Sequence, residues 1–262
     1  MKKIKLSSVS LLLFLSTIAQ EDLSKIRDSI LSEAKKLYRS ESASWNGTDI
    51  FLQNYKGAQN NIGGYFSYAD DENEVCVFFS ASSTPLILGT IVFDKNDKVT
   101  FDTTQRQCTN KEKDYYSLRE AAYKEVNSDT AFFKTYKNTS LNLVPFIEGD
   151  KRVIYVLTGT GSNDIVIFGN DYLLTFDQSN KLVSKKSLHK NIIVANYSKS
   201  DKEEGPAHTH LPETGNFITA TDLCTTMLYQ GIAKWKQNMV VSEKYMSIWN
   251  CKENVLAIIP YR

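Results

Sequence analysis

Apolar residues recur every three or four positions in two stretches of the chain, with charged residues between them. This is the period of an amphipathic helix, so the sequence predicts helices over residues 21–38 and 109–126. A third helix is predicted over residues 219–230, where the pattern returns and Gly231 follows as a terminator. Between the first two helices, Asn46-Gly47 predicts a polar loop and residues 50–55 predict a strand.

Much of the remaining chain consists of short runs rich in Val, Ile, Tyr and Phe, separated by turn residues. Such runs predict β-strands. Gly159-Thr160-Gly161 predicts a turn, because it lacks the further motif residues of a nucleotide-binding loop. The predicted strands span residues 65–68, 75–80, 86–93 and 99–101 in the first half, and 153–158, 164–168, 172–176, 181–184, 192–195, 239–241, 246–249 and 255–259 in the second.

These elements predict an α+β (mixed α/β) fold. We expect a strand-rich N-terminal region over residues 21–140, and a C-terminal sheet packed with helices over residues 141–262. The chain of 262 residues is long enough to bury a substantial core. Its formal net charge of +1 gives no electrostatic reason to expect nucleic acid as a partner.

The N-terminus has the pattern of a secretory signal. Lys2, Lys3 and Lys5 precede the apolar run at residues 9–15, and the small residues of Thr17-Ile18-Ala19 follow. This order predicts a signal peptide over residues 1–20 and a secreted or periplasmic location. The apolar run is too short to span a bilayer, so we expect a protein that is not an integral membrane protein.

Export changes the interpretation of the four cysteines. An even count in an oxidising compartment favours disulfides, and three connectivities are open. Proximity in the sequence favours Cys76–Cys108 and Cys224–Cys251. The alternative is four buried free thiols.

The chain contains three histidines, and two of them stand in His208-Thr209-His210. On a strand, a period of two places both rings on the same face. Asp222 follows at the predicted start of the third helix. Two imidazoles and one carboxylate can hold zinc and leave one position for water. His189 is isolated in the sequence and is interpreted as structural.

The spacing of these residues resembles the JAMM metalloprotease family. Its signature is His-x-His-Pro followed, after seven more residues, by Ser-x-x-Asp. His208, His210 and Asp222 correspond to its zinc ligands, and Thr219 stands at its serine. Leu211 replaces the proline, and Pro212 comes one place later.

The resemblance implies a JAMM-like C-terminal domain that uses zinc to hydrolyse peptide or isopeptide bonds. It implies a glutamate that accepts the proton of the zinc-bound water, for which Glu148 is the first candidate. Glu203 and Glu204 are weaker candidates because they lie in a charged loop. Thr219 would stabilise the oxyanion. An alternative role for Thr219 and Asp222 is a capping box, which requires no metal.

Two functions therefore remain open. The first is an exported zinc-dependent peptidase or isopeptidase, an amide hydrolase acting on an unknown protein or peptide substrate. The second is a secreted, non-catalytic binding or interaction protein with a degenerate JAMM-like fold. A serine hydrolase is disfavoured because the chain has no Gly-x-Ser-x-Gly motif.

Overall fold

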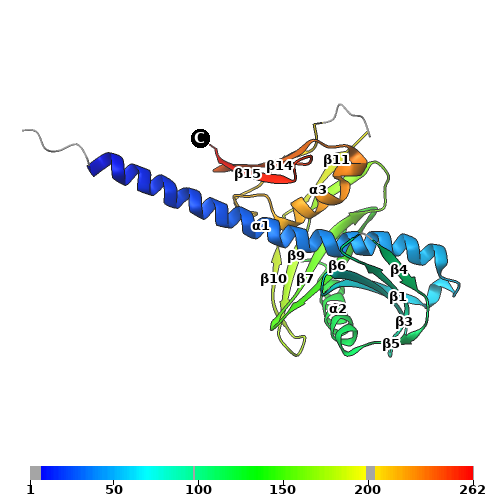
Figure 1. Cartoon of the computed structure of the whole chain (residues 1–262). Helices are drawn as coiled ribbons and strands as arrows, with labels where there is room; N and C mark the ends of the chain where they lie inside the picture. The colour runs from blue at the N-terminus through cyan, green and yellow to red at the C-terminus, as the bar shows by residue number, and fades with distance from the viewer. Residues whose placement is uncertain (1–6, 97, 199–203, 262) are drawn as a thin grey trace, which may run out of the picture.

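The computed structural model describes residues 7–96, 98–198 and 204–261, and for residues 7–21 the backbone alone. Within these ranges there are three α-helices: α1 (Ser7–Asn54), α2 (Asn110–Ser128) and α3 (Ala220–Ala233). A short 3-10 helix, η1, spans Gln59–Asn61. Helices account for 29% of the structure and sheets for 39%, so the predicted α+β class is confirmed. Figure 1 shows the first part of α1 projecting away from the sheets and the remainder of the helix running past them.

Sheet A contains the strands of the first half. It consists of β1 (Ile62–Asp70), β2 (Asn73–Ser80), β3 (Leu86–Phe93) and β4 (Val99–Asp102) in that order, with β5 (Arg106–Gln107) paired to β3. All pairings are antiparallel. Side chains on one face pack against Phe51 of α1, and those on the other face pack against Tyr115 of α2.

Helix α1 is much longer than predicted. The expected loop at Asn46-Gly47 and the expected strand over residues 50–55 are helical, apart from the last residue. Phe51 stacks on Phe78 of sheet A with ring centroids 4.0 Å apart. A Cβ atom at Gly47 would lie 3.0 Å from the Cβ of Cys76, so glycine lets the helix approach the sheet. Burial of Phe51 contributes about 1.5–3 kcal/mol, which exceeds the roughly 1 kcal/mol that a glycine costs a helix.

Sheet B has the order β10-β9-β7-β6. Its strands are β6 (Thr139–Glu148), β7 (Lys151–Thr160), β9 (Tyr172–Phe176) and β10 (Leu182–Ser187). The turn expected at residues 159–161 begins later, because β7 pairs with β6 as far as Thr160↔Thr139. Helix α2 packs on both sheets: Tyr115 joins the core of sheet A and Leu118 that of sheet B. The expected domain boundary at 140/141 falls inside β6.

Two smaller sheets complete the fold. Sheet C pairs β8 (Ile165–Gly169) with β11 (Ile192–Asn196). Sheet D has the order β12-β13-β14-β15. Its strands are β12 (Ala207–Thr209), β13 (Gln237–Val241), β14 (Tyr245–Asn250) and β15 (Val255–Pro260). Strands β12 and β13 are parallel, and α3 lies between them in the sequence.

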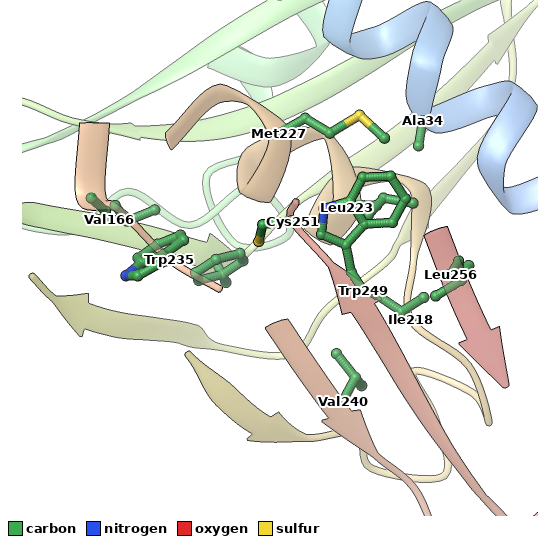
Figure 2. Close-up of a cluster of buried hydrophobic side chains, with 12 residues drawn as sticks. Ala34, Val166, Ile218, Leu223, Met227, Trp235, Val240, Trp249, Cys251 and Leu256 are labelled. Atoms are coloured by element: carbon green, nitrogen blue, oxygen red, sulfur yellow. The ribbon is translucent and has the colours of Figure 1, made fainter. Parts of the chain in front are cut away.

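One hydrophobic cluster connects α1, α3 and the two smaller sheets. Figure 2 shows its buried side chains, with Trp249 between Leu223 of α3 and Leu256 of β15. Val240 belongs to this cluster and is the β13 residue paired with His208. Leu223 follows Asp222 directly in α3. The core therefore fixes the two backbone segments that carry the predicted metal ligands.

The four cysteines are buried free thiols, so the expected pairs Cys76–Cys108 and Cys224–Cys251 are wrong for this fold. Cys76 lies on the α1 face of sheet A and Cys108 on the α2 face. Cys224 packs between α1 and sheet B, whereas Cys251 packs with the core of sheet D. Closeness in the sequence does not bring these side chains to the same side of an element.

The predicted signal peptide lies largely beyond what the structure describes. Residues 1–6 are outside the described ranges, and residues 7–20 form the first turns of α1 without described side chains. The signal and the location it implies therefore stay predictions. Within the described parts of the chain, no helix has the length and apolarity that a membrane crossing requires.

Candidate metal centre

Strand β12 and the residue that follows it present His208 and His210 on one buried face. Their side chains are 4% and 1% exposed, whereas Ala207 and Thr209 beside them are exposed. This is the period-two arrangement expected from the sequence. Pairing to β13 fixes the strand on both sides of His208, through hydrogen bonds from Met239 N to Pro206 O at 3.1 Å and from His210 N to Val241 O at 2.9 Å.

The first turn of α3 fixes Asp222. Thr219 is the N-cap residue, and its hydroxyl accepts a hydrogen bond from Asp222 N at 3.0 Å. In return, Asp222 Oδ2 accepts hydrogen bonds from Thr219 N at 3.0 Å and from Thr219 Oγ1 at 2.7 Å. The capping box weighed as an alternative from the sequence is therefore present. It also holds the carboxylate in a fixed orientation toward β12.

His189 is the site residue that the sequence interpretation missed. It lies in the connection between β10 and β11 and is buried. Its Nε2 atom lies 3.2 Å from Asp222 Oδ1 and 3.3 Å from Oδ2. The one sequence feature that could have indicated His189 is the small number of histidines. All three of them converge on one carboxylate in the structure.

The four side chains converge through their ligand atoms. His210 Nε2 lies 3.2 Å from Asp222 Oδ2, and His208 Nε2 lies 3.5 Å from Asp222 Oδ1. The Nε2 atoms of His208 and His210 are 3.3 Å apart. His189, His210 and Asp222 each offer one ligand atom within 4.8 Å of the others, so this buried group could hold a metal ion.

A hydrogen bond orients the His210 ring, and a carboxylate lies behind the His189 ring. His210 Nδ1 lies 2.9 Å from the carbonyl oxygen of Phe217, the geometry of a hydrogen bond donated by the ring. Asp171 Oδ2 lies 3.5 Å from His189 Nδ1. Contacts of this kind to carbonyl or carboxylate groups are typical of metal-binding histidines, because they fix the tautomer and leave Nε2 for the metal.

The charges in the site stabilise the ionised carboxylate. Burial alone would raise the pKa of Asp222, but His189 and the nearby nitrogens of His208 and His210 hold it well below its usual range. Burial lowers the pKa of His189, and the carboxylates of Asp222 and Asp171 more than offset this and raise it overall. A divalent cation would replace part of that positive charge and would displace protons from the rings on binding.

Three buried atoms of the site have no hydrogen-bond partner among the described residues: Asp222 Oδ1, His189 Nδ1 and His208 Nδ1. Asp222 Oδ1 is the acceptor among them that faces the histidines. It is buried and accepts no hydrogen bond of good geometry from the described residues, although two imidazole nitrogens lie within 3.5 Å of it. A buried carboxylate oxygen normally accepts hydrogen bonds. The nearest nitrogens, those of His189 and His208, are not placed for a good hydrogen bond to Oδ1, so this oxygen is free to serve as a metal ligand.

The predicted catalytic residues are not brought together. Glu148 ends β6, and its Oε1 accepts a hydrogen bond from Lys36 Nζ of α1 at 2.7 Å. The hollows that Glu148 lines contain no histidine. Thr219 is beside the site, but its hydroxyl is used by the cap. Glu203 lies outside the described residues, and Glu204 forms an ion pair with Lys236.

The sequence predicted three of the four converging side chains, His208, His210 and Asp222, and the structure adds His189. Asp171 completes the arrangement from behind. No protein-family model matches this chain, and a comparison with curated proteins finds no match, so the site stands on its own geometry.

Proposed function

We propose that this chain is a zinc-binding protein, and that His189, His208, His210 and Asp222 enclose the ion. The environment of Asp222 Oδ1 carries this proposal. In a tetrahedral zinc site with metal–ligand distances of about 2.0–2.1 Å, neighbouring ligand atoms lie about 3.3–3.4 Å apart. The distances given above run from 3.2 to 3.5 Å, with His189 and His208 measured to Oδ1 of Asp222 and His210 measured to Oδ2. The ligand atoms that all lie within 4.8 Å of one another are those of His189, His210 and Asp222, and His208 borders this group through His210 and Asp222.

A structural role for the zinc is the better supported one. Four protein ligands fill a tetrahedral ion and leave no position for water, as in structural zinc sites. The ligands come from the β10–β11 connection, from β12 and the residue after it, and from the start of α3. An ion shared by these segments would hold the C-terminal part of the fold together. This supports a non-catalytic binding or interaction protein, and the predicted signal peptide supports its export.

An amide hydrolase, which the resemblance to JAMM proteases implies, is the second candidate. The observation in its favour is a cavity of about 300 Å³ that is lined in part by His208. If His208 were not a ligand, the other three side chains would leave one position open to that cavity. Zinc would then supply a water molecule with a pKa of about 7. Among the described residues, the predicted base Glu148 is not placed to accept its proton, because it is paired with Lys36.

Metal analysis of the purified full chain tests the proposal. We expect one zinc per chain, and loss of that zinc in His189→Ala as well as in His210→Ala. X-ray absorption at the zinc edge should show four nitrogen or oxygen ligands that include three imidazoles. Zinc that remains at full occupancy in His189→Ala would contradict the enclosed site. A purified chain that takes up no zinc after incubation with the ion would contradict the whole proposal.

A peptide-hydrolysis assay separates the two candidates. The structural site predicts no zinc-dependent cleavage of a general protein substrate such as casein, by wild type or by His208→Ala. Cleavage that chelation abolishes and zinc restores would favour the hydrolase.

A further inference from the structure

The cavity beside His208 lies between two strand edges that belong to different sheets. Strand β11 pairs with β8 on one side, and β12 pairs with β13 on one side. Among the described residues, neither has a second strand partner. Residues 193–196 of β11 and 204–208 around β12 line the same cavity of about 300 Å³. This volume is at the lower end of the range of known ligand sites.

The register of β11 shows which backbone groups face this cavity. Tyr197 N donates to Asp164 O at 3.0 Å, so Tyr197 and Asp164 are a hydrogen-bonded pair. In antiparallel pairing such residues alternate with residues whose N–H and C=O groups point away from the partner. Val194 and Asn196 are therefore the residues that direct their backbone groups away from β8.

The register of β12 gives the same result from the other side. Pro206 and His210 bond to β13 through Met239 N and Val241 O. In a parallel pair, alternate residues bond to one partner, so Ala207 and Thr209 direct their backbone groups away from β13. Both wall strands thus offer backbone donors and acceptors to the space between them.

Two buried aromatic residues belong to the cavity lining. Phe168 and Trp235 line it, with ring centroids 6.1 Å apart, and Phe168 also contacts the His208 ring at 5.6 Å. The charged side chain in the lining is Glu204, and its carboxylate is paired with Lys236 at 2.7 Å. A matching ligand is uncharged along its central part.

We propose that this cavity binds a short extended peptide segment, which lies as a strand between β11 and β12. Its backbone would bond to both edges, and an apolar side chain would lie on Phe168 and Trp235. This is recognition by strand addition. The wall strands have five and three residues, so a ligand run of about three to five residues suffices. The proposal requires no metal, although His208 belongs to both sites.

The test uses the full chain and a pool of capped heptapeptides that alternate threonine with randomised uncharged residues. Retained peptides are identified by mass spectrometry, and their affinities are measured by calorimetry. We expect retained peptides with an apolar central residue, and slower hydrogen exchange at Val194 and Ala207 when they bind. Failure to retain any peptide of the pool would overturn the proposal.

A pair of matched valine variants tests the location. Val194→Pro removes an N–H group that faces the cavity. This group makes no hydrogen bond to β8, and proline is tolerated at such a position on a strand edge. Val99 lies on the edge strand β4, where the bond from Asp94 N to Lys98 O turns the Val99 amide away from β3. Val194 and Val99 are 51% and 42% exposed. We expect Val194→Pro to weaken binding about tenfold, the value of one hydrogen bond, and Val99→Pro to leave it unchanged.

A modified ligand gives the same information without a variant. Methylation of alternate backbone nitrogens of a retained peptide should abolish binding to wild type, since it removes the donors toward one edge. Equal binding of the methylated peptide would overturn the proposal. The proposal would also be overturned if sedimentation showed that the chain self-associates and that this association covers the edges of β11 and β12. Zinc content should be unchanged in Val194→Pro, so this variant tests the peptide site independently of the metal site.

Discussion

At the scale of single residues, Asp171 acts on the candidate metal centre without supplying a ligand to it. Its Oδ1 atom accepts a hydrogen bond from Thr158 N at 3.1 Å, which fixes the carboxylate behind His189. Carboxylates that orient a metal-binding histidine typically contribute about 10–100-fold to metal affinity. We expect Asp171→Asn to bind zinc with an affinity lower by about that factor, measured by competition with a chromogenic chelator.

The exposed Asp164 of the β7–β8 connection provides the control for this prediction. Asp164→Asn makes the same chemical change away from the histidines and should leave zinc affinity unchanged. An Asp171→Asn variant with wild-type affinity would show that the carboxylate does not orient His189. Complete loss of zinc in that variant would instead point to collapse of the site, and circular dichroism would detect it.

Local patterns in the sequence are sufficient to predict that His208, His210 and Asp222 belong to one site, but they are insufficient to predict His189. The two histidines follow from the period of a strand, and Asp222 follows from its distance to an N-cap threonine. His189 reaches the site because β8 and β11 pair and β10 ends beside Asp171. Such long-range pairing leaves no local signal. Glu148 has only its place before a strand in its favour, and in the fold it pairs with Lys36.

At the scale of elements, the cap of α3 couples the helix to the site. Thr219 holds Asp222 through three hydrogen bonds within one capping box. Thr219→Ala should destabilise the fold by about 1 kcal/mol, and it should lower zinc affinity roughly tenfold because Asp222 loses its orientation. Thermal unfolding and chelator competition measure the two effects.

Helix α2 has the same kind of cap and offers a matched control. Thr109 and Glu112 form its capping box, and Glu112 contacts Arg106 rather than the candidate metal centre. Thr109→Ala should cost a similar free energy of unfolding and leave zinc affinity as in wild type. Equal zinc affinities in the two variants would mean that the α3 cap has only a structural role.

Strand β12 depends on a glycine at its entrance. Gly205 has φ +121°, and a Cβ atom there would lie 1.8 Å from Gln237 O. Gly205→Ala must therefore move β12 away from β13, so we expect loss of zinc from the purified variant. Gly215 has φ +112°, and a Cβ atom added there would have no neighbour within 4 Å. Gly215→Ala bears similar backbone strain without the clash and should retain the metal.

Elements with strong local patterns are predictable, and those decided by packing are not. The helix predicted over residues 109–126 corresponds to α2, with Thr109 as its cap. The local sequence of the second half of α1 predicts a loop and a strand, because Asn46-Gly47 normally ends a helix. Its helical state depends on contacts with sheet A that the segment alone does not encode.

At the scale of the whole molecule, α1 is the element that joins the separate sheets. It packs on sheet A through Phe51, on sheet B through Leu37 and on the C-terminal core through Ala34. Glu41 lies between these contacts. Its Oε2 accepts a hydrogen bond from Asn142 Nδ2 of β6 at 2.7 Å. Burial raises the pKa of Glu41 to about 7, and the bond from Asn142 only partly opposes this.

The raised pKa of Glu41 makes the stability of this junction depend on pH. The folded protein favours the protonated carboxyl, so its contribution is fully present below the unfolded pKa of about 4.3 and is lost as pH rises through 7. After allowance for its partial exposure, we expect unfolding free energy to fall by about 2 kcal/mol between pH 5 and pH 8. Glu41→Gln cannot ionise, so the decline in unfolding free energy between pH 5 and pH 8 should become smaller in this variant. Urea unfolding with zinc held constant measures it.

Glu112, whose pKa is lowered, provides the opposite case. Glu112→Gln should lose stability at neutral pH and keep the decline between pH 5 and pH 8. A decline of equal size in Glu41→Gln would assign the pH dependence to another group and leave α1 without this link.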